Sequence, residues 1–181
     1  MEDLRENLWS HFFKSPRKNY NPYMFKLLEY PEYIIYDKKI MDSYKGKWHE
    51  FFGNNNPIYL EIGSGSGNFA QGMAKRYPER NHIGLELRFK RLVLSAVKVK
   101  RDGSTNALFL RRRGEEILEF VAENEVDGIY VNFPDPWEEN EKNRVVQESF
   151  FKTLDVILKK GGIFYFKTDH DKYYQDVIDL V

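Results

Sequence analysis

The sequence predicts an α/β fold, with a doubly wound and mostly parallel sheet of the Rossmann-like type. From Pro57 onward, short apolar runs alternate with amphipathic stretches, as expected where helices connect parallel strands. A run of glycines follows the first apolar run directly, at the position of the first strand-to-helix turn. The chain has 181 residues, which is enough for one such domain and too few for a second full one.

Each predicted strand is a short apolar run that contains β-branched or aromatic residues. The strands are expected at residues 58–62, 83–87, 107–110, 128–133 and 163–166. The helices that connect and follow them are expected at residues 68–77, 89–102, 115–123, 145–159 and 172–181. Pro78 is predicted to stop the first helix, Gly103 the second, and Gly161 with Gly162 the fourth.

The helix predicted over residues 89–102 is amphipathic. Its apolar face is formed at helical spacing by Phe89, Leu92, Val93, Ala96 and Val97. Its other face is basic, and it contributes to a local excess of Arg and Lys between residues 88 and 113. This excess fits either a solvated helix face or a surface that contacts RNA.

Residues 1–50 differ from residues 51–181, for which we expect the Rossmann-like domain. In the first segment, aromatic side chains alternate with Lys and Arg, and the periodicity is weak, which predicts an aromatic and basic arm with one short helix. Such an arm can stack on bases and neutralise phosphates, or it can dock on its own domain. At the other end, the chain stops on an apolar helix, so the C-terminal strands of the sheet are expected to be missing.

Composition excludes several classes of function. The 28 basic and 28 acidic side chains give a formal net charge of +0, which argues against coating nucleic acid by bulk attraction. The lack of cysteine excludes disulfides, thiolate metal sites and thiol nucleophiles. The spacing of the four histidines is not typical of metal ligands, so no metal is expected. No apolar stretch is long enough for a signal peptide or a membrane span, so we expect a cytoplasmic protein without a membrane partner.

The strongest motif is the glycine run between the first predicted strand and the first predicted helix. Gly63, Gly65 and Gly67 allow a tight turn and let a ligand lie against backbone N–H groups, although such runs also occur for structural reasons alone. Their spacing is not the Gly-x-Gly-x-x-Gly of dinucleotide-binding folds. Glu61 precedes the run, and an acid here suits a ligand with a cationic sulfonium and an amino acid. We therefore expect S-adenosylmethionine as cofactor, bound by Glu61, Gly63 and Gly65.

Glu86 lies at the end of the second predicted strand. A carboxylate at this place can accept both hydroxyls of a ribose in the crevice above the sheet, while the alternative is a salt bridge to Arg88 or Arg91. Because the carboxyl ends of adjacent parallel strands meet at one edge, Glu61 and Glu86 are expected to bind the same cofactor.

The segment Asn-Phe-Pro-Asp-Pro-Trp at residues 132–137 directly follows the fourth predicted strand. Its two prolines stiffen the loop, so that Asp135 and Trp137 are held in one orientation at the sheet edge. Trp137 is predicted to stack on a flipped base, and Asp135 to accept hydrogen bonds from a purine edge. A rigid turn with Trp137 as a lid on the core is the structural alternative.

Guanine N7 carries an in-plane lone pair, so it can attack a sulfonium methyl group without a general base. The enzyme must align N7 with the methyl group and stabilise the positive charge that develops on the purine. We expect Asp135 to supply that stabilisation as the catalytic residue. An exocyclic amine would instead need an amide oxygen and a backbone carbonyl, which Asn132 and Pro134 could provide, so methylation of a base amino group stays open.

Asp169 follows the fifth predicted strand, at the same sheet edge as Asp135. It could hold the target nucleoside, and the structural alternative is the N-cap of the last helix.

Together these residues resemble the bacterial tRNA (guanine-N7)-methyltransferase family of the TrmB type. The resemblance covers most of the chain in order, and the Asn-Phe-x-Asp-Pro-Trp element is quite specific to that family. The matching segments are residues 44–48, 52–57, 61–67, 83–86, 131–137 and 166–169.

The resemblance implies methylation of guanine N7 in the variable loop of tRNA, with S-adenosylmethionine as donor. It also implies that Glu61 and Glu86 bind the cofactor, that Asp135 acts in catalysis or on the cofactor side, and that Asp169 contacts the tRNA. Bacterial members resemble self-sufficient enzymes, so we expect a monomer or weak homodimer with tRNA as partner.

Three departures from the family pattern leave other functions open. Arg113 and Gly114 stand where the family usually has Asp-Ala, an acidic segment at residues 138–142 replaces a basic one, and a C-terminal Thr-x-x-Glu-like element is lacking. A catalytically weak RNA-binding or cofactor-binding module is therefore an alternative. A nicotinamide oxidoreductase is a further alternative, which the glycine spacing opposes.

Overall fold

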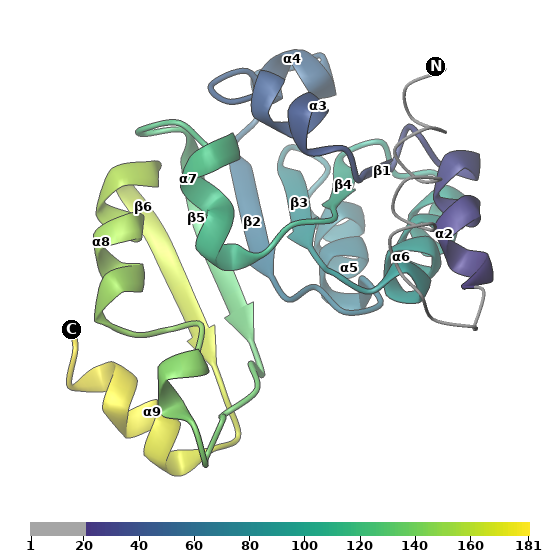
Figure 1. Ribbon diagram of the computed structural model, residues 1–181. Coiled ribbons are helices and arrows are strands. Elements are labelled where there is room, and N and C mark those ends of the chain that lie inside the picture. Colours follow the sequence, from purple (N-terminus) through teal and green to yellow (C-terminus); the bar gives the residue numbers. More distant parts are fainter. Residues whose placement is uncertain (1–20) are drawn as a thin grey trace.

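The computed structural model describes residues 21–181, which form one six-stranded sheet (Figure 1). The strands are β1 (Ile34–Ile35), β2 (Ile58–Ile62), β3 (Asn81–Leu85), β4 (Ala107–Leu110), β5 (Val126–Asn132) and β6 (Leu158–Lys167). Their order across the sheet is β1-β4-β3-β2-β5-β6, and every neighbouring pair is parallel. The predicted α/β fold with a parallel sheet is confirmed. The predictions for residues 1–20 lie outside the described residues.

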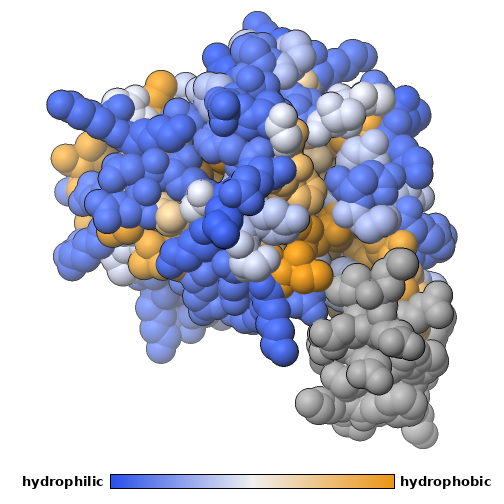
Figure 2. All heavy atoms as spheres, turned by 90° about the horizontal axis from the view of Figure 1, so that it is seen from above, coloured by the Kyte–Doolittle hydropathy of each residue, from blue (hydrophilic) through white to orange (hydrophobic). Residues whose placement is uncertain are grey.

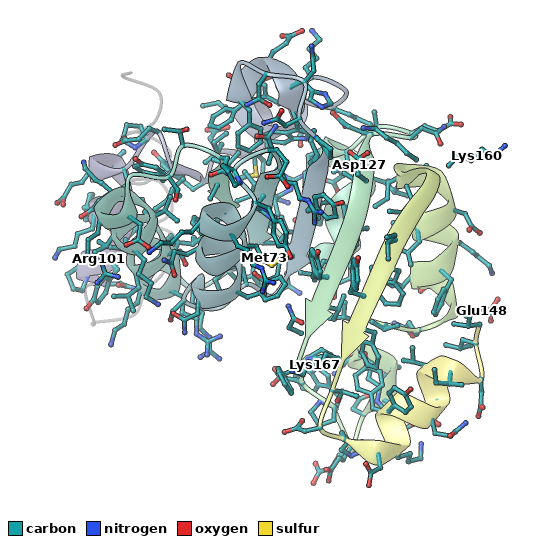
Figure 3. The ribbon with its side chains drawn as sticks, turned by 180° about the vertical axis from the view of Figure 1, so that it is seen from behind. Met73, Arg101, Asp127, Glu148, Lys160 and Lys167 are labelled. Carbon is teal, nitrogen blue, oxygen red and sulfur yellow. The ribbon has the colours of Figure 1, made fainter. Side chains whose placement is uncertain are left out.

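Helices pack on both faces of the sheet. They are α2 (Pro22–Lys26), α3 (Lys38–Ser43), α4 (Trp48–Phe52), α5 (Asn68–Arg76), α6 (Phe89–Asp102), α7 (Ile117–Phe120), α8 (Glu148–Ile157) and α9 (Asp171–Ile178), with 3-10 turns η1 (Leu27–Glu29), η2 (Gly114–Glu116) and η3 (Glu141–Asn143). One hydrophobic cluster joins α5, α6 and η1 to the sheet, and a second joins α3, α4, α7, α8 and α9 to it. From behind, α5 and α6 lie on one side of the picture, and no described helix lies in front of β5 and β6 (Figure 3).

Residues 21–50 share the sheet and the core of the rest of the domain. β1 pairs with β4, with Ile34 opposite Phe109. Trp48 is completely buried, and its indole N–H donates to the Phe120 carbonyl at 2.8 Å. The described part of the predicted arm is therefore docked on the domain, and its aromatic residues serve packing.

Several predicted strand boundaries and one predicted cap differ from the structure. β3 begins two residues earlier than expected because the polar residues Asn81 and His82 are buried strand residues: both pair with β2, and His82 also pairs with β4. The prediction that Gly161 and Gly162 cap a helix is wrong. Helix α8 ends at Ile157 and the two glycines lie inside β6, where the pairing with β5 shifts register.

The predicted apolar face of α6 needs one correction. Val97 is 39% exposed, whereas Val99 is completely buried among the residues of the cluster that joins α5 and α6 to the sheet. The rotation of the helix therefore places position 99, and not 97, against the sheet. The other four residues predicted for this face are buried or packed against the cluster.

The surface is mostly hydrophilic on the side where α3 and α4 lie (Figure 2). Within residues 21–181, none of the helices combines the length and the apolar character that a membrane crossing requires.

Candidate active site

The predicted glycine turn connects β2 to α5 through three positive φ angles. Gly63, Gly65 and Gly67 have φ values of 74°, 57° and 72°, which L side chains rarely adopt. A Cβ at Gly67 would lie 2.6 Å from Ser95 of α6, so this glycine lets α5 and α6 approach closely. No atom lies within 4 Å of a Cβ built at Gly63 or Gly65. The first two glycines therefore leave open space at the carboxyl end of β2, where a ligand could contact the backbone.

Glu61 is buried one residue before the end of β2. Its Oε1 accepts a hydrogen bond from the Asn132 side chain at 3.1 Å, whereas its Oε2 has no partner among the described residues. Burial raises the pKa of this carboxyl group to about 7, although the Asn132 side chain and the Ala70 backbone N–H both act in the opposite direction. A buried carboxyl group with an unused oxygen suits a positively charged group, so Glu61 fits the sulfonium or ammonium of S-adenosylmethionine.

Glu86 follows β3 directly and is also buried. Its Oε1 accepts the backbone N–H groups of Leu87 and Arg88, both at 2.8 Å, and its Oε2 lies 3.3 Å from Nη1 of Arg91. The salt bridge to Arg91 that the sequence left open is present. The same contacts fix the carboxylate in one position at the sheet edge.

A pocket of about 360 Å³ lies at the carboxyl ends of the central strands. Four of the predicted site residues line it: Gly63, Glu86, Asp135 and Trp137. The other predicted residues, Glu61, Gly65 and Asp169, are not part of its lining. Glu61 reaches it through Asn132, which lines the pocket and donates to the Glu61 carboxyl group.

The loop after β5 forms one wall of this pocket, here called the β5 wall (residues 132–137). Phe133 and Trp137 have φ values of 49° and 48°, a left-handed conformation that is strained for residues with a side chain. Both rings are about half exposed, and Nζ of Lys167 lies 5.0 Å from the Phe133 ring centroid. Trp137 is therefore presented at the pocket and is no lid on the core.

Arg144, which the sequence analysis missed, holds the β5 wall in place. Its side chain is only 5% exposed, and its Nε donates to the carbonyl of Pro136 at 2.6 Å. Its Nη1 lies 2.7 Å from Asp176 of α9, and its guanidinium lies 4.5 Å from the Tyr173 ring centroid. The only sequence signal was an arginine next to the apolar pair at 145–146, because its partners are distant in the chain.

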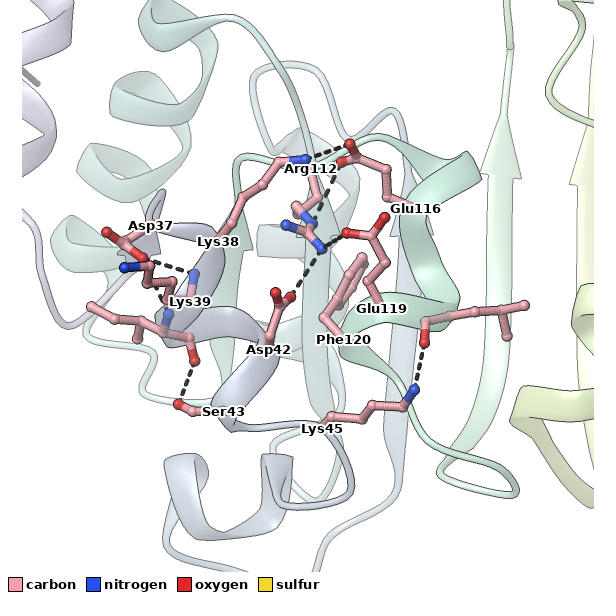
Figure 4. A network of polar contacts seen from close by, with 12 residues as sticks. Asp37, Lys38, Lys39, Asp42, Ser43, Lys45, Arg112, Glu116, Glu119 and Phe120 are labelled. Carbon is pink, nitrogen blue, oxygen red and sulfur yellow. Dashed lines mark hydrogen bonds and ion pairs between the residues drawn. The ribbon is translucent and has the colours of Figure 1, made fainter. Parts of the chain in front are cut away.

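The opposite wall, here called the β4 wall (residues 112–115), is organised by another buried arginine (Figure 4). The Arg112 side chain is 0% exposed, and its Nη2 lies 2.9 Å from Asp42 and 2.5 Å from Glu119. Its Nε lies 3.5 Å from Glu116. Asp42 belongs to α3, so Arg112 ties the N-terminal region to the pocket, which the sequence analysis did not predict.

Arg113 and Gly114, the predicted departure from the family pattern, both line the pocket. A Cβ at Gly114 would come within 2.9 Å of the Ile62 side chain. The β4 wall therefore passes closely over the end of β2, and glycine permits that approach.

Asp169 is exposed in the connection between β6 and α9. The N-cap of α9 is His170, whose Nδ1 accepts the N–H of Tyr173 at 3.0 Å, so the alternative role of Asp169 as a cap is wrong. The predicted acidic segment packs on α9, with Glu138 at 3.2 Å from His170 and Glu141 at 2.6 Å from Lys172. In the described part of the chain, no cluster of three or more His, Asp or Glu side chains could hold a metal ion.

The chain is similar to curated methyltransferases over most or all of its length. A bifunctional glycosyltransferase/methyltransferase of Fusobacterium nucleatum subsp. nucleatum is 58% identical over 184 residues, which cover 100% of this chain and 29% of that protein. A tRNA (guanine-N(7)-)-methyltransferase of Enterococcus faecalis is 42% identical over 151 residues, which cover 82% of this chain and 69% of that protein. The chain thus spans less than a third of the first relative and about two thirds of the second.

Solved structures support the fold alone. TrmN from Thermus thermophilus superposes with a TM-score of 0.56 at 21% identity, covering 77% of this chain and 40% of that chain. The aminoglycoside resistance methyltransferase NpmB1 superposes with a TM-score of 0.55 at 21% identity, covering 75% of this chain and 68% of that chain.

The family model Methyltransf_4, described as "Putative methyltransferase", matches residues 55–181. The chain therefore belongs to this methyltransferase family, the TrmB type that its motifs resemble.

Proposed function

We propose that this chain transfers the methyl group of S-adenosylmethionine to N7 of a guanine in tRNA. The observation that carries the proposal is the shared pocket: Asp135 and Trp137 line it together with Gly63 and Glu86. The tRNA (guanine-N(7)-)-methyltransferase of Enterococcus faecalis supports the choice of substrate.

In this proposal the cofactor lies between the glycine turn and the β4 wall. S-adenosylmethionine supplies an activated methyl group when it is bound. Glu61 would face its positive charge, Glu86 its ribose hydroxyls, and Gly63 and Gly65 would let it contact the backbone. The unused oxygen of Glu61 and the empty space above both glycines support these roles.

The target guanine would enter between the two walls. Trp137 would stack on the base, since its ring is 46% exposed at the pocket. Asp135 would stabilise the positive charge that develops on the purine as N7 is methylated. Asp169, exposed after β6, would contact the tRNA outside the pocket.

The experiment is transfer of tritiated methyl groups into unmodified tRNA, followed by digestion and nucleoside mapping. We expect 7-methylguanosine from the wild type. We expect a loss of at least about 100-fold in turnover with Asp135→Ala, while cofactor binding measured by calorimetry survives in part. Asp155→Asn, an exposed carboxylate on α8, is the matched control and should leave turnover unchanged. Undiminished turnover in the Asp135 variant would refute the role of that residue.

Two other outcomes would replace the proposal. N6-methyladenosine without 7-methylguanosine would indicate a base amino methyltransferase, which the pocket position of Asn132 makes chemically reasonable. Cofactor binding without any methyl transfer would indicate a binding module.

A further inference from the structure

The side of the pocket next to α6 is strongly cationic. Six basic side chains extend from α2 across the first turn of α6 to the pocket. This set, the cationic rim, consists of Lys26, Arg88, Lys90, Arg91, Arg111 and Arg113.

Ring contacts and a shared pocket connect the members of the rim. Arg88, Arg91 and Arg113 line the same pocket. The guanidinium of Arg111 lies 4.3 Å from the ring centroid of Phe89, in the first turn of α6. The next residue, Lys90, lies 5.8 Å from the ring centroid of Tyr23, as does Lys26. The six cations are therefore linked to one another through shared rings and the common pocket lining.

The rim carries charge that the described residues do not neutralise. Arg91 pairs with Glu86 at 3.3 Å, and the other five rim cations form no ion pair with a described residue. Lys26 and Lys90 each lie 5.8 Å from the centroid of the Tyr23 ring, so two positive charges gather around one side chain. An anionic ligand would be attracted to both charges.

The other side of the pocket differs in charge and in chemistry. Beyond Trp137 lies the acidic segment with Glu138, Glu139 and Glu141, whose carboxylates disfavour phosphate groups even though Glu138 and Glu141 also pair with His170 and Lys172. At the pocket itself, Phe133 and Trp137 present half-exposed rings. Stacking rings next to a row of cations are typical of surfaces that bind single-stranded nucleic acid.

We propose that the cationic rim binds the phosphate backbone of the RNA substrate, so that the RNA reaches the pocket from the α6 side and avoids the acidic segment. The proposal rests on the proposed function and adds the direction of approach. It also assigns a binding role to Lys26 and Lys90, which lie outside the pocket.

The test measures affinity for an unmodified tRNA transcript by filter binding between 50 and 300 mM salt. In the first variant, K26E/K90E, we expect at least about 10-fold weaker binding and a decrease in salt dependence, because each lost phosphate contact lowers the slope of log K against log salt by about 0.9. A second variant, R88E/R113E, changes the pocket end of the rim and should weaken tRNA binding similarly. The control K47E/K160E has the same change in net charge at exposed residues away from the rim, and should bind within about threefold of the wild type.

Cofactor binding and thermal unfolding of every variant show whether the fold and the donor site persist. Wild-type affinity in K26E/K90E would overturn the inference, and 7-methylguanosine formed by the wild type would then leave the proposed function standing. Rim-dependent tRNA binding without methyl transfer would support the inference and overturn the proposed function. Absence of tRNA binding by the wild type would overturn both. Displacement of tRNA by polyglutamate as effective as by unlabelled RNA would overturn the RNA assignment in favour of an acidic protein partner.

Discussion

The two walls of the pocket are each held by a buried arginine, but the arginines act in different ways. Arg112 of the β4 wall contacts three side-chain carboxylates, those of Asp42, Glu116 and Glu119. Arg144 of the β5 wall donates to a backbone carbonyl, that of Pro136, in addition to its ion pairs. The first arginine therefore joins elements of the fold, and the second fixes the path of a loop.

The backbone of the two walls differs in the same sense. In residues 21–181, the non-glycine residues with positive φ are Asn124, Phe133 and Trp137, and two of these three belong to the β5 wall. The β4 wall uses Gly114 for its closest approach to β2. Strain at non-glycine residues tends to collect where side chains are presented for function. We therefore expect the β4 wall mainly to support the fold and, in the proposed reaction, the β5 wall mainly to position the reacting groups.

The largest effect on stability is expected from Arg112→Met. Methionine removes the charge that Asp42, Glu116 and Glu119 share, and we expect the free energy of unfolding to fall by about 3 kcal/mol. Urea unfolding measures this loss. At a temperature where the variant stays folded, turnover with tRNA should remain within about fivefold of the wild type. A variant as stable as the wild type would contradict the structural role of this wall.

For Arg144→Met we expect the opposite: a large loss of turnover and a smaller loss of stability. Without the bond to Pro136 the loop loses its fixed path, and displacement of reacting groups by about 1 Å can lower turnover about 100-fold. We expect this loss in kcat for methyl transfer, with the Kd for the cofactor within about threefold of the wild type. Asp176→Asn is the matched control, since it weakens the ion pair and leaves the carbonyl bond intact. An equal loss of turnover in that control would show that the ion pair with α9, and not the bond to Pro136, causes the effect.

The sequence was sufficient to predict most of the sheet because strands β2 to β5 are largely buried and mostly apolar. It was insufficient for β1, where two isoleucines have no periodic context and pair only through the tertiary fold. It also placed the start of β3 too late, because buried Asn81 resembles a loop residue. Its Nδ2 donates to Asn54 at 2.7 Å, which satisfies the amide inside the protein.

The candidate site was predictable where residues follow strand ends. Glu86 and Asp135 reach one pocket because the carboxyl ends of parallel strands share an edge. Arg112 and Arg144 were not predictable, since their partners lie up to 70 residues away and an isolated arginine resembles a solvated one. Local patterns thus identify several of the groups that line the pocket, and the groups that hold its walls emerge only from tertiary contacts.

Glu61, which accepts a hydrogen bond from Asn132 of the β5 wall, makes the stability of the protein depend on pH. Its pKa is raised to about 7 in the folded protein from 4.5. The unfolded chain therefore loses the proton first as pH rises, so the stability contribution present below pH 4.5 is lost by the time pH passes 7. Between pH 5 and pH 8 the free energy of unfolding of the wild type should fall by roughly 2.5 kcal/mol because of this group. Glu61→Gln, which cannot titrate there, should not show this fall.

Thermal and urea unfolding of both proteins at pH 5 and pH 8 test this difference. A cationic ligand should reverse this loss of stability at high pH, because a positive charge beside Oε2 favours the carboxylate form of Glu61. We therefore expect S-adenosylmethionine to stabilise the wild type more at pH 8 than at pH 6, and to stabilise Glu61→Gln weakly at both values. If the free energy of unfolding changed equally with pH in the two unliganded proteins, Glu61 would not be the titrating group.

The smallest effect should come from Phe133→Gly, which tests whether the β5 wall stores strain. Glycine adopts the φ of 49° without penalty, and this gain should offset the lost contact with Lys167 and the added freedom of the unfolded chain. We expect the free energy of unfolding to change by less than about 0.5 kcal/mol. Ile163→Gly is the control, because Ile163 is 46% exposed in β6 and has no positive φ, and glycine there should cost about 1 kcal/mol. Equal losses in the two variants would mean that Phe133 is not strained, and the contrast between the two walls would then rest on their arginines alone.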